Sequence, residues 1–471
     1  MNKDLTKTPG NGLKKSYGAK HALRNKKRLQ ASPHRLTHAT YEKICDFCLS
    51  DLSNPTKALI MVMMITGRQV EHILSESVSY EVLPSGVGKL GATWRFTSPS
   101  SSIFTTLGKL KVSENPFITI PPVLATLLLY IRAARLELSD WESLIKDLLS
   151  GFRGPTGQLV TMNSLQRVID FEYRAIGMPR LYKDFIANRR KSENMQSYYV
   201  AFRESELRQH YLNFMGIFIP DVEVAACAAE YFSDDLLFGS HRALDKSGVQ
   251  ALFQVIIRAL QRAIHEGDSV RVHNYYQTYV VTYLQLATMH RPMKNVLRTI
   301  KHFHKDFSQV EIEDKSENST RLVPLCESGR QVLAQYINYL KACRNRLRFI
   351  NHAKYQAVCD MLSGTSNLFR IQTDSGFLDD FSQSSWGFDD PIFHKINWHR
   401  NTTATQLFQA GADSDAIEAF MGHRQDLDSP TSLFSTATYE QLIEIADRID
   451  TFFKDFQIPT VQLPTVYLRK Y

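Results

Sequence analysis

The sequence contains few cysteines and no long hydrophobic run. Its 471 residues include six cysteines, and Cys45 and Cys48 form a lone C-x-x-C pair. Because no second pair of ligands follows, we expect no zinc site and reduced thiols, as in a cytoplasm. The most apolar run, Ala58–Ile65, is far shorter than the roughly 18 residues that a transmembrane helix needs. It is predicted to be a buried helix segment, and we expect no membrane partner.

Nucleotide-binding and targeting motifs are also missing. The sequence has neither a P-loop nor the glycine-rich fingerprint of a dinucleotide site, so we expect no cofactor of these kinds. The basic N-terminus is not followed by an apolar segment of the kind found in signal peptides. These absences leave the side chains themselves as the source of any chemistry.

Residues 400–423 have the pattern of two short helices. Apolar residues recur at helical spacing after Arg400, and Gly411 is placed to end the first helix in the left-handed conformation. A second helix follows and closes just before His423. Two helix ends would thus bring Arg400 and His423 close together on a rigid frame. The alternative is an ordinary helical hairpin with a surface arginine and histidine.

Two further basic residues lie upstream. An apolar helix is predicted over 275–287, and Arg291 follows it next to a proline that interrupts the helix. Val310–Glu313 and Arg321–Leu325 alternate as strands around a turn-rich segment. The pattern predicts a β-hairpin with Lys315 near its tip. Taken singly, each of these cations is better interpreted as a solvated surface charge.

Taken together, Arg291, Lys315, Arg400 and His423 resemble the tyrosine recombinase (phage integrase) family of DNA breaking and joining enzymes. The most specific segment runs from Arg400-Asn-Thr-Thr-Ala-Thr through Ala-Gly-Ala-Asp to Phe-Met-Gly-His423, and the resemblance covers about residues 245–450. It implies a C-terminal catalytic domain in which the two arginines, the lysine and the histidine surround the phosphate to be cleaved. It also implies a tyrosine nucleophile and a 3′-phosphotyrosyl intermediate, without metal or cofactor.

The chemistry of phosphodiester cleavage fits these residue types. Guanidinium groups such as those of Arg291 and Arg400 hold non-bridging oxygens bidentately and stabilise the charge that develops on them. Lys315 on a mobile hairpin is suited to protonate the leaving 5′ oxygen, and His423 to donate a hydrogen bond to the phosphate. A covalent intermediate conserves the phosphodiester energy, so the strands rejoin without ATP.

Three positions depart from the family pattern. Asn397 stands where a histidine is usual; it can hydrogen-bond a phosphate oxygen but cannot act as a base. Lys294 replaces an acidic residue. Phe434 occupies the nucleophile position, and a phenyl ring cannot attack phosphorus. The chain is therefore expected to be inactive as given.

Three explanations of Phe434 are open. An engineered Tyr-to-Phe change would stop cleavage while keeping DNA binding, and a naturally inactive paralogue would behave in the same way. Alternatively, Tyr439 is the nucleophile. Its position in the next predicted helix, from Tyr439 to Phe453, favours a packing aromatic instead.

Positive charge is concentrated in the first 35 residues. This segment has ten basic residues and one acid, Asp4, so it carries more positive charge than the whole chain, whose net charge is +8. With few large apolar residues it should be a flexible arm that orders on DNA phosphates; the alternative is a solvated tail. The predicted phosphate contacts in the arm are Lys14, Lys15, Arg24, Lys26, Lys27 and Arg28.

The length of the chain allows two or three domains. Helical periodicity predominates, with strand-like segments between about 92 and 120, so we predict a mainly α fold with a small β-sheet or hairpin. The predicted parts are the basic arm (1–35), an N-terminal or core DNA-binding region (36–215), a linker (216–244), the catalytic domain (245–456) and a C-terminal tail (457–471).

The region before the catalytic domain is less clearly marked. By analogy with the family, it should clamp the duplex from the opposite side, and Arg189, Arg190 and Lys191 are candidate phosphate contacts. The alternative is that these three form a solvated helix face. Thr66-Gly67-Arg68 also resembles the Thr288-Met-His-Arg291 segment. A degenerate copy of the catalytic fold and a coincidence among helix-rich segments both account for this.

We therefore expect a site-specific DNA recombinase or integrase. Its expected partners are double-stranded DNA, further copies of the chain in dimers to tetramers, and an accessory DNA-bending protein, at the nucleoid in a prokaryotic cytoplasm. The runner-up is a non-catalytic DNA-binding protein, either an inactive relative or a regulator that uses residues 401–423 as a helix-turn-helix. Residues 457–468 are expected to dock on a neighbouring protomer; the alternative is a tail folded back on its own domain.

Overall fold

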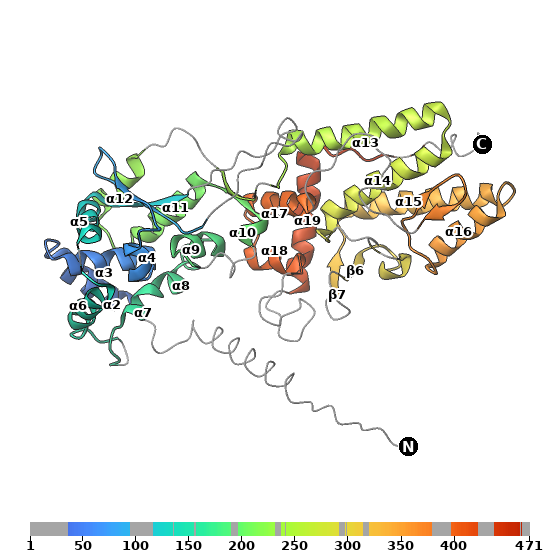
Figure 1. The fold of residues 1–471 in the computed structure, drawn as a ribbon. Helices are drawn as coiled ribbons and strands as arrows, with labels where there is room; N and C mark the ends of the chain where they lie inside the picture. Colours follow the sequence, from blue (N-terminus) through green and yellow to red (C-terminus); the bar gives the residue numbers. More distant parts are fainter. Residues whose placement is uncertain are drawn as a thin grey trace, which may run out of the picture.

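Helices dominate the fold, and the few strands form small antiparallel sheets, as predicted. The computed structural model describes residues 36–94, 116–134, 136–154, 157–189, 196–230, 237–240, 242–291, 297, 299–313, 320–378, 397–422, 438–461 and 463. Figure 1 shows an elongated molecule in which an N-terminal body (described residues 36–239) and a C-terminal body (described residues 242–463) meet near α17 and α18.

The N-terminal body is built around the buried helix α3 (Pro55–Thr66). The side chain of Asn54 caps its first turn, Gly67 ends it with a φ of 64°, and every residue after Pro55 is buried. This confirms the predicted buried helix at Ala58–Ile65. The other elements of the N-terminal body, in chain order, are α2 (His38–Leu49), α4 (Val70–Leu74), the sheet β1 (Tyr80–Val82), β2 (Gly88–Gly91) and β3 (Phe117–Ile120), α5 (Pro122–Ala133), α6 (Leu138–Leu149), α7 (Met162–Gln166), α8 (Val168–Glu172), α9 (Arg180–Ile186), α10 (Gln196–Tyr199), β4 (Ala201–Arg203) and α11 (Glu204–Met215).

The predicted linker at 216–244 is largely ordered structure. It contains α12 (Asp221–Ala229), which packs against α5 and α11, and β5 (Leu237–Gly239), which pairs with β4. Burial of Cys227 anchors α12, and burial of all three β5 residues anchors the strand. The stretch therefore belongs mainly to the N-terminal body, because its apolar side chains have a core to join.

The C-terminal body contains the predicted helices and hairpin. The hairpin strands pair with Ile312 opposite Arg321, and its tip, with Lys315, lies outside the described residues. The elements are α13 (Lys246–Glu266), α14 (Ser269–Thr288), the 3-10 helix η3 (Ile300–His302), β6 (Gln309–Glu313), β7 (Thr320–Pro324), α15 (Glu327–Leu347), α16 (His352–Ser363), β8 (Ile371–Gln372), β9 (Phe377–Leu378), α17 (Trp398–Gln409), α18 (Ser414–Phe420) and α19 (Tyr439–Asp455).

The start of the C-terminal tail lies on its own chain. The hydroxyl of Tyr279 on α14 donates to the carbonyl of Pro459 at 2.8 Å and accepts from the amide of Val461 at 3.1 Å. Ile458 is buried. This part of the predicted exchange segment is thus folded back, as the alternative interpretation had it, and docking on a neighbour stays a prediction for the residues beyond 463.

The described part of the chain lacks two kinds of feature, membrane-spanning helices and clusters of metal ligands. None of its helices combines the length and apolar character that a membrane crossing requires. Nor do its Cys, His, Asp and Glu side chains form a cluster of three or more suited to a metal ion. Burial raises the pKa of both Cys45 and Cys48 to about 12, so these thiols stay protonated at neutral pH.

Candidate functional site

Two buried arginines hold the end of α18. Arg400, in the first turn of α17, donates from Nη2 to the carbonyl of Met421 at 3.0 Å. Arg321, on β7, donates from Nη1 to the adjacent carbonyl of Phe420. The last carbonyls of a helix lack partners within it and carry the negative end of its dipole, so guanidinium donors are well matched to them. The strand and α17 are thereby fixed to the helix end that precedes His423.

The segment that contains Arg291 contacts the first turn of α17. α14 ends at Thr288, and Met289 adopts the left-handed conformation with a φ of 48°, which turns the chain sharply. The ring of His399 then lies with Nε2 2.7 Å from the carbonyl of His290. His290 precedes Arg291 and His399 precedes Arg400, so this contact joins the two backbone segments that carry the predicted arginines. Arg291 itself is half-buried.

The two histidines are neutral and oriented. Nε2 of His399 must carry a proton to donate to the His290 carbonyl, which leaves Nδ1 as an acceptor. The hydroxyl of Thr288 donates to the carbonyl of Leu284, so it accepts from Nδ1 of His290, and Nε2 of His290 is also an acceptor. Both acceptor nitrogens are buried without a hydrogen-bond partner among the described residues.

Burial and the nearby cations keep these rings uncharged. Burial lowers the pKa of His399 to about 3, with Arg400 adding to the effect. For His290 the pKa falls well below its usual value, first through burial and then through His399, Arg321 and Arg400. The site therefore combines buried guanidinium groups, which suit an anion such as a phosphodiester, with neutral imidazoles whose N–H groups bind within the protein.

The N-terminal body contributes a residue to this site. The guanidinium carbon of Arg400 lies 5.1 Å from the ring centroid of Tyr199, on α10. Next to it, the amide of Ala201 donates to the Thr405 hydroxyl at 3.0 Å, and α17 is buried over most of its length between the two bodies. Arg400 is fully buried in this conformation. A ligand phosphate therefore reaches it only when the covering groups move.

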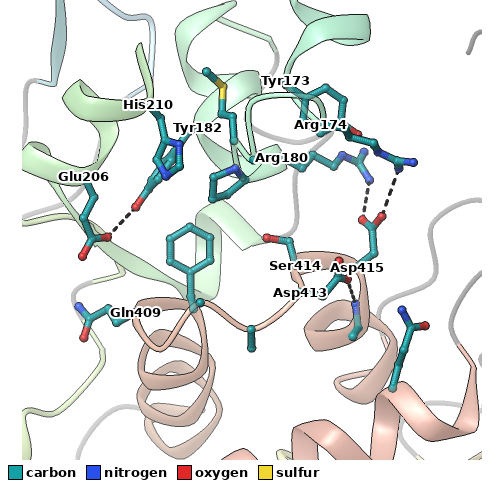
Figure 2. A pocket seen from close by; sticks show the side chains of 18 residues that line it. Tyr173, Arg174, Arg180, Tyr182, Glu206, His210, Gln409, Asp413, Ser414 and Asp415 are labelled. Carbon is teal, nitrogen blue, oxygen red and sulfur yellow. Dashed lines mark hydrogen bonds and ion pairs between the residues drawn. The ribbon is translucent and has the colours of Figure 1, made fainter. Parts of the chain in front are cut away.

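A polar cleft lies beside this junction (Figure 2). It has a volume of about 690 Å³ and is lined by α9, α11 and the turn between α17 and α18. Asp415 faces Arg174 at 3.6 Å and Arg180 at 3.9 Å across the cleft. These pairs join the two bodies at the surface, and the amide of Gln196 adds a hydrogen bond to the Ser414 carbonyl at 2.6 Å.

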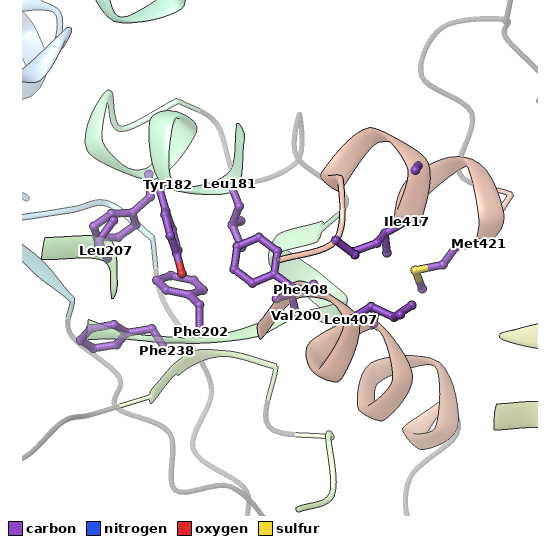
Figure 3. Close-up of a cluster of buried hydrophobic side chains, with 14 of the residues drawn as sticks. Leu181, Tyr182, Val200, Phe202, Leu207, Phe238, Leu407, Phe408, Ile417 and Met421 are labelled. Atoms are coloured by element: carbon purple, nitrogen blue, oxygen red, sulfur yellow. The ribbon is translucent and has the colours of Figure 1, made fainter. Parts of the chain in front are cut away.

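Apolar side chains from both bodies pack beneath the cleft. Figure 3 shows Phe408 of α17 among residues of the N-terminal body and of α18. Its ring lies edge-on to Tyr182 with centroids 5.3 Å apart, and Tyr182 packs edge-on against Phe202 at 5.4 Å. Contacts of this kind make the junction a continuous core rather than a flexible linkage.

Other predicted site residues fall into two groups. Asn397 precedes α17 with a φ of 74°, and its side-chain oxygen is buried without a hydrogen-bond partner among the described residues. Asn397 lies three residues before Arg400, and its contact with a phosphate stays a prediction. The residues outside the described part are Lys315, His423 and Phe434 of the predicted centre and Lys14, Lys15, Arg24, Lys26, Lys27, Arg28, Arg190 and Lys191 of the predicted DNA contacts.

Two further residues of the predictions have contacts in the structure. Arg189 forms an ion pair with Asp170 at 3.0 Å, and its carbonyl accepts from the indole of Trp94, so it has partners within the N-terminal body, and its contact with a phosphate stays a prediction. Tyr439 is the first residue of α19 and is 36% exposed, so it is not a packing aromatic in the helix interior. The helix begins at Tyr439, as predicted, and the Thr438 capping box fixes that start, so the ring lies at the end of the helix.

Sequence reasoning missed Arg321, His290 and Tyr199. A signal for Arg321 existed, because its strand alternates and places it on the same buried face as Val323. His290 and His399 each precede a predicted site arginine, and this repeated His-Arg pair was a second signal. Tyr199 had none, since only packing of the two bodies brings it to Arg400. No protein-family model, curated protein or solved structure matches this chain.

Proposed function

We propose that this chain is a DNA-binding protein of the tyrosine recombinase type, with a phosphodiester site formed by Arg291, Arg400 and their surroundings. The observation that carries the proposal is the hydrogen bond between His399 and the carbonyl of His290, which joins segments 109 residues apart. It unites the two arginine motifs that the resemblance requires at one phosphate. Arg321 adds a third guanidinium group near the same histidines.

The residues have distinct roles in the proposed reaction. Attack on phosphorus increases the negative charge on the non-bridging oxygens, and Arg291 and Arg400 stabilise that charge. Lys315 protonates the leaving 5′ oxygen, and His423 donates to the phosphate, as the resemblance implies. Phe434 has no hydroxyl to form the covalent link. The chain as given therefore binds DNA without cleaving it, and a tyrosine at this position supplies the nucleophile.

A non-catalytic role is the second candidate, and Phe434 is the observation that favours it. Such a protein would use the same phosphate site for binding alone. The helix-turn-helix version of this role is less well supported. The recognition helix of such a motif is the second one, which inserts an exposed face into the major groove, whereas α18 packs against α17 and α19 and has no exposed residue.

Trapping on a nicked suicide substrate tests the proposal. The unaltered chain should give no SDS-stable adduct with DNA, and Phe434→Tyr should give one. Tyr439→Phe in both backgrounds is the matched control, because it removes the competing hydroxyl. An adduct from the unaltered chain that disappears with Tyr439→Phe would assign the nucleophile to Tyr439. Failure of either chain to bind DNA would reject the proposal.

Assembly on DNA is part of the proposal. Partners of a recombinase include double-stranded DNA, further protomers and an accessory bending protein, with the nucleoid of a prokaryotic cell as its place. The tail beyond residue 463 is the proposed exchange segment, since residues before it bind Tyr279 of their own chain. Deleting residues 464–471 should preserve binding to a single half-site and abolish the slower complexes of paired sites in a gel shift. Deleting 457–471 is the comparison, because it also removes the contacts to α14.

Unchanged paired-site complexes after the shorter deletion would rule out exchange through this tail. Loss of half-site binding after the longer deletion alone would show instead that residues 457–463 stabilise their own domain.

A further inference from the structure

The connection between α15 and α16 is strongly basic. Between Glu327 and Asp360 the sequence contains no acidic residue and six lysines or arginines. Nothing in the tyrosine recombinase motifs accounts for this run, which lies between the strand with Arg321 and the helix with Arg400. The basic side chains are Arg330, Lys341, Arg344, Arg346, Arg348 and Lys354.

Two large apolar side chains protrude at the same point. α15 ends at Leu347 and α16 begins at His352, and in the turn between them Phe349 is 85% exposed and Ile350 is 62% exposed. Phe349 is the most exposed large hydrophobic residue in the described part of the chain. Neighbouring apolar groups that stay in water next to charges indicate a contact surface for a partner. We call Lys341, Arg344, Arg348, Phe349, Ile350 and His352 the basic tip.

Helix stability explains only part of this composition. Arg344 and Arg346 lie in the last turn of α15, where positive charge interacts favourably with the helix dipole. His352 and Lys354 lie in the first turn of α16, where positive charge is unfavourable and the structure has no acid. The two helices thus add cations at both sides of the turn, which raises its positive potential.

Several arginines of the N-terminal body have acidic partners, in contrast to the cations of the basic tip. There, Arg174, Arg180 and Arg189 each face an aspartate within 4.0 Å. In the basic tip, no ion pair of the described residues involves Lys341 or Arg348, and Arg348 lies 5.8 Å from the Phe349 ring. The charge of the tip is therefore available to an external anion.

The position of the tip fits DNA beyond the phosphate site. α15 has 21 residues and starts directly after β7, which holds Arg321. At 1.5 Å per residue the tip lies about 30 Å along the helix from that strand, or about nine base pairs of duplex. Figure 1 shows α15 and α16 at the end of the molecule away from the N-terminal body.

We propose that the basic tip is a second contact with duplex DNA, in which Arg344 and Arg348 bind phosphates and Phe349 and Ile350 enter the minor groove as a wedge. Apolar side chains flanked by cations bend DNA in this way, by separating base pairs while phosphate contacts hold the strands. The inference rests on the proposed function for its ligand, but it does not depend on cleavage.

Salt-dependent DNA binding tests the phosphate contacts. The probe is a duplex of roughly 30 base pairs, long enough to extend past both contacts, and binding is sequence-independent at low salt. Arg344→Gln with Arg348→Gln should reduce the slope of log K against log salt by about 1.8, because two phosphate contacts are lost. Arg258→Gln with Arg262→Gln is the matched control, since both are exposed on α13 with the same spacing.

DNA bending tests the wedge separately. Phe349→Ser with Ile350→Ser should reduce the bend, measured by energy transfer between the duplex ends, and leave the salt slope unchanged. Val222→Ser, at an exposed position on α12, is the control. All these positions are on the surface, so equal melting temperatures should show that the variants fold.

The outcomes separate the two proposals. If the unaltered chain binds DNA and the tip variants match their controls in slope and bend, the tip proposal is overturned and the proposed function stands. The tip proposal would also be overturned if the tip variants lost binding to anionic lipid vesicles while the salt slope of their DNA binding stayed unchanged. If the unaltered chain does not bind DNA at all, both proposals fail.

Discussion

Each body of this molecule has an arginine just after an apolar helix, buried in the N-terminal body and half-buried in the C-terminal body, and the two arginines differ in their surroundings. In the N-terminal body, α3 ends at Thr66, Gly67 is left-handed and Arg68 follows. In the C-terminal body, α14 ends at Thr288, Met289 is left-handed and Arg291 comes two residues later. In both, the terminal threonine hydroxyl donates to the carbonyl four residues before it at 2.7 Å. Antiparallel strands and a further helix follow in each case.

The contacts found around the two arginines differ. Arg68 donates to the carbonyl of Ile186 at 2.8 Å and to that of Gly91 at 2.5 Å, and so joins β2 to α9. Burial lowers its pKa to about 9. Arg291 follows His290, whose carbonyl is bound by His399, the residue before Arg400. Arg400 and Arg321 likewise bind backbone carbonyls, those of Met421 and Phe420, but unlike Arg68 they lie close to a buried histidine, His290.

The shared order of elements leaves both interpretations of the N-terminal body in place. In a degenerate copy of the catalytic fold, the helix, the left-handed residue and the arginine would remain, and the other site residues would be lost. If the similarity is a coincidence, the two bodies share only the way in which these helices end. The predictions below test whether the two arginines have the different roles that their surroundings indicate.

The largest expected effect is on cleavage. In the Phe434→Tyr background, Arg291→Ala or Arg400→Ala should lower the rate of adduct formation by about 10²–10³-fold or more, because each removes charge stabilisation from the transition state. DNA affinity should fall only modestly, since many other phosphate contacts remain. Arg258→Ala on α13 is the control. Near-normal cleavage after either site change would remove that arginine from the proposed site.

Arg68 should affect stability instead. Arg68→Met keeps the length of the side chain but leaves the carbonyls of Gly91 and Ile186 buried without a donor. The expected loss is about 3 kcal/mol in the free energy of unfolding of the N-terminal body. Urea denaturation followed by tryptophan fluorescence measures it, because Trp94 and Trp141 are buried in this body. An unchanged midpoint with weakened DNA binding would place Arg68 in a binding site instead.

The histidines of the site should make the C-terminal body sensitive to acid. The folded pKa of His399 is about 3, against a usual value of 6.5, so the neutral ring stabilises the fold above pH 6.5. That contribution is lost as the pH falls from 6.5 towards 3, at about 1.4 kcal/mol per pH unit. His399→Gln keeps a donor for the His290 carbonyl but does not titrate. The unfolding free energy of this variant should depend less steeply on pH than that of the unaltered chain. Equal pH dependence in the two proteins would show that His399 is not a buried neutral ring.

The smallest expected effect concerns Tyr199, where the two bodies meet. Its ring restrains the Arg400 guanidinium through a cation–π contact of about 1 kcal/mol. In the Phe434→Tyr background, Tyr199→Leu should therefore slow adduct formation by roughly fivefold, and Tyr199→Phe should leave it unchanged. Single-turnover kinetics distinguish the two variants. A faster reaction with Tyr199→Leu would show that the ring blocks Arg400 rather than orienting it.

Local rules made much of the C-terminal body predictable. The turn at Gly411, the apolar stripe of α17 and the alternation of β6 and β7 depend on neighbours within a few residues, and all are present. Two other helix boundaries, the end of α14 and the start of α17, escaped prediction. Met289 and Asn397 are left-handed although neither is glycine, because the surrounding contacts offset the steric cost of that conformation.

The sequence by itself determined the order and type of the main elements and the identity of the motif arginines, because helix periodicity, capping and turn chemistry act over a few residues. Only the tertiary structure decided that Arg321 and Tyr199 belong to the site, that Arg189 pairs with Asp170, and that the tail begins on its own α14. These contacts join residues that are distant along the chain. Which of them form depends on how whole helices and strands pack, and no local pattern records that outcome.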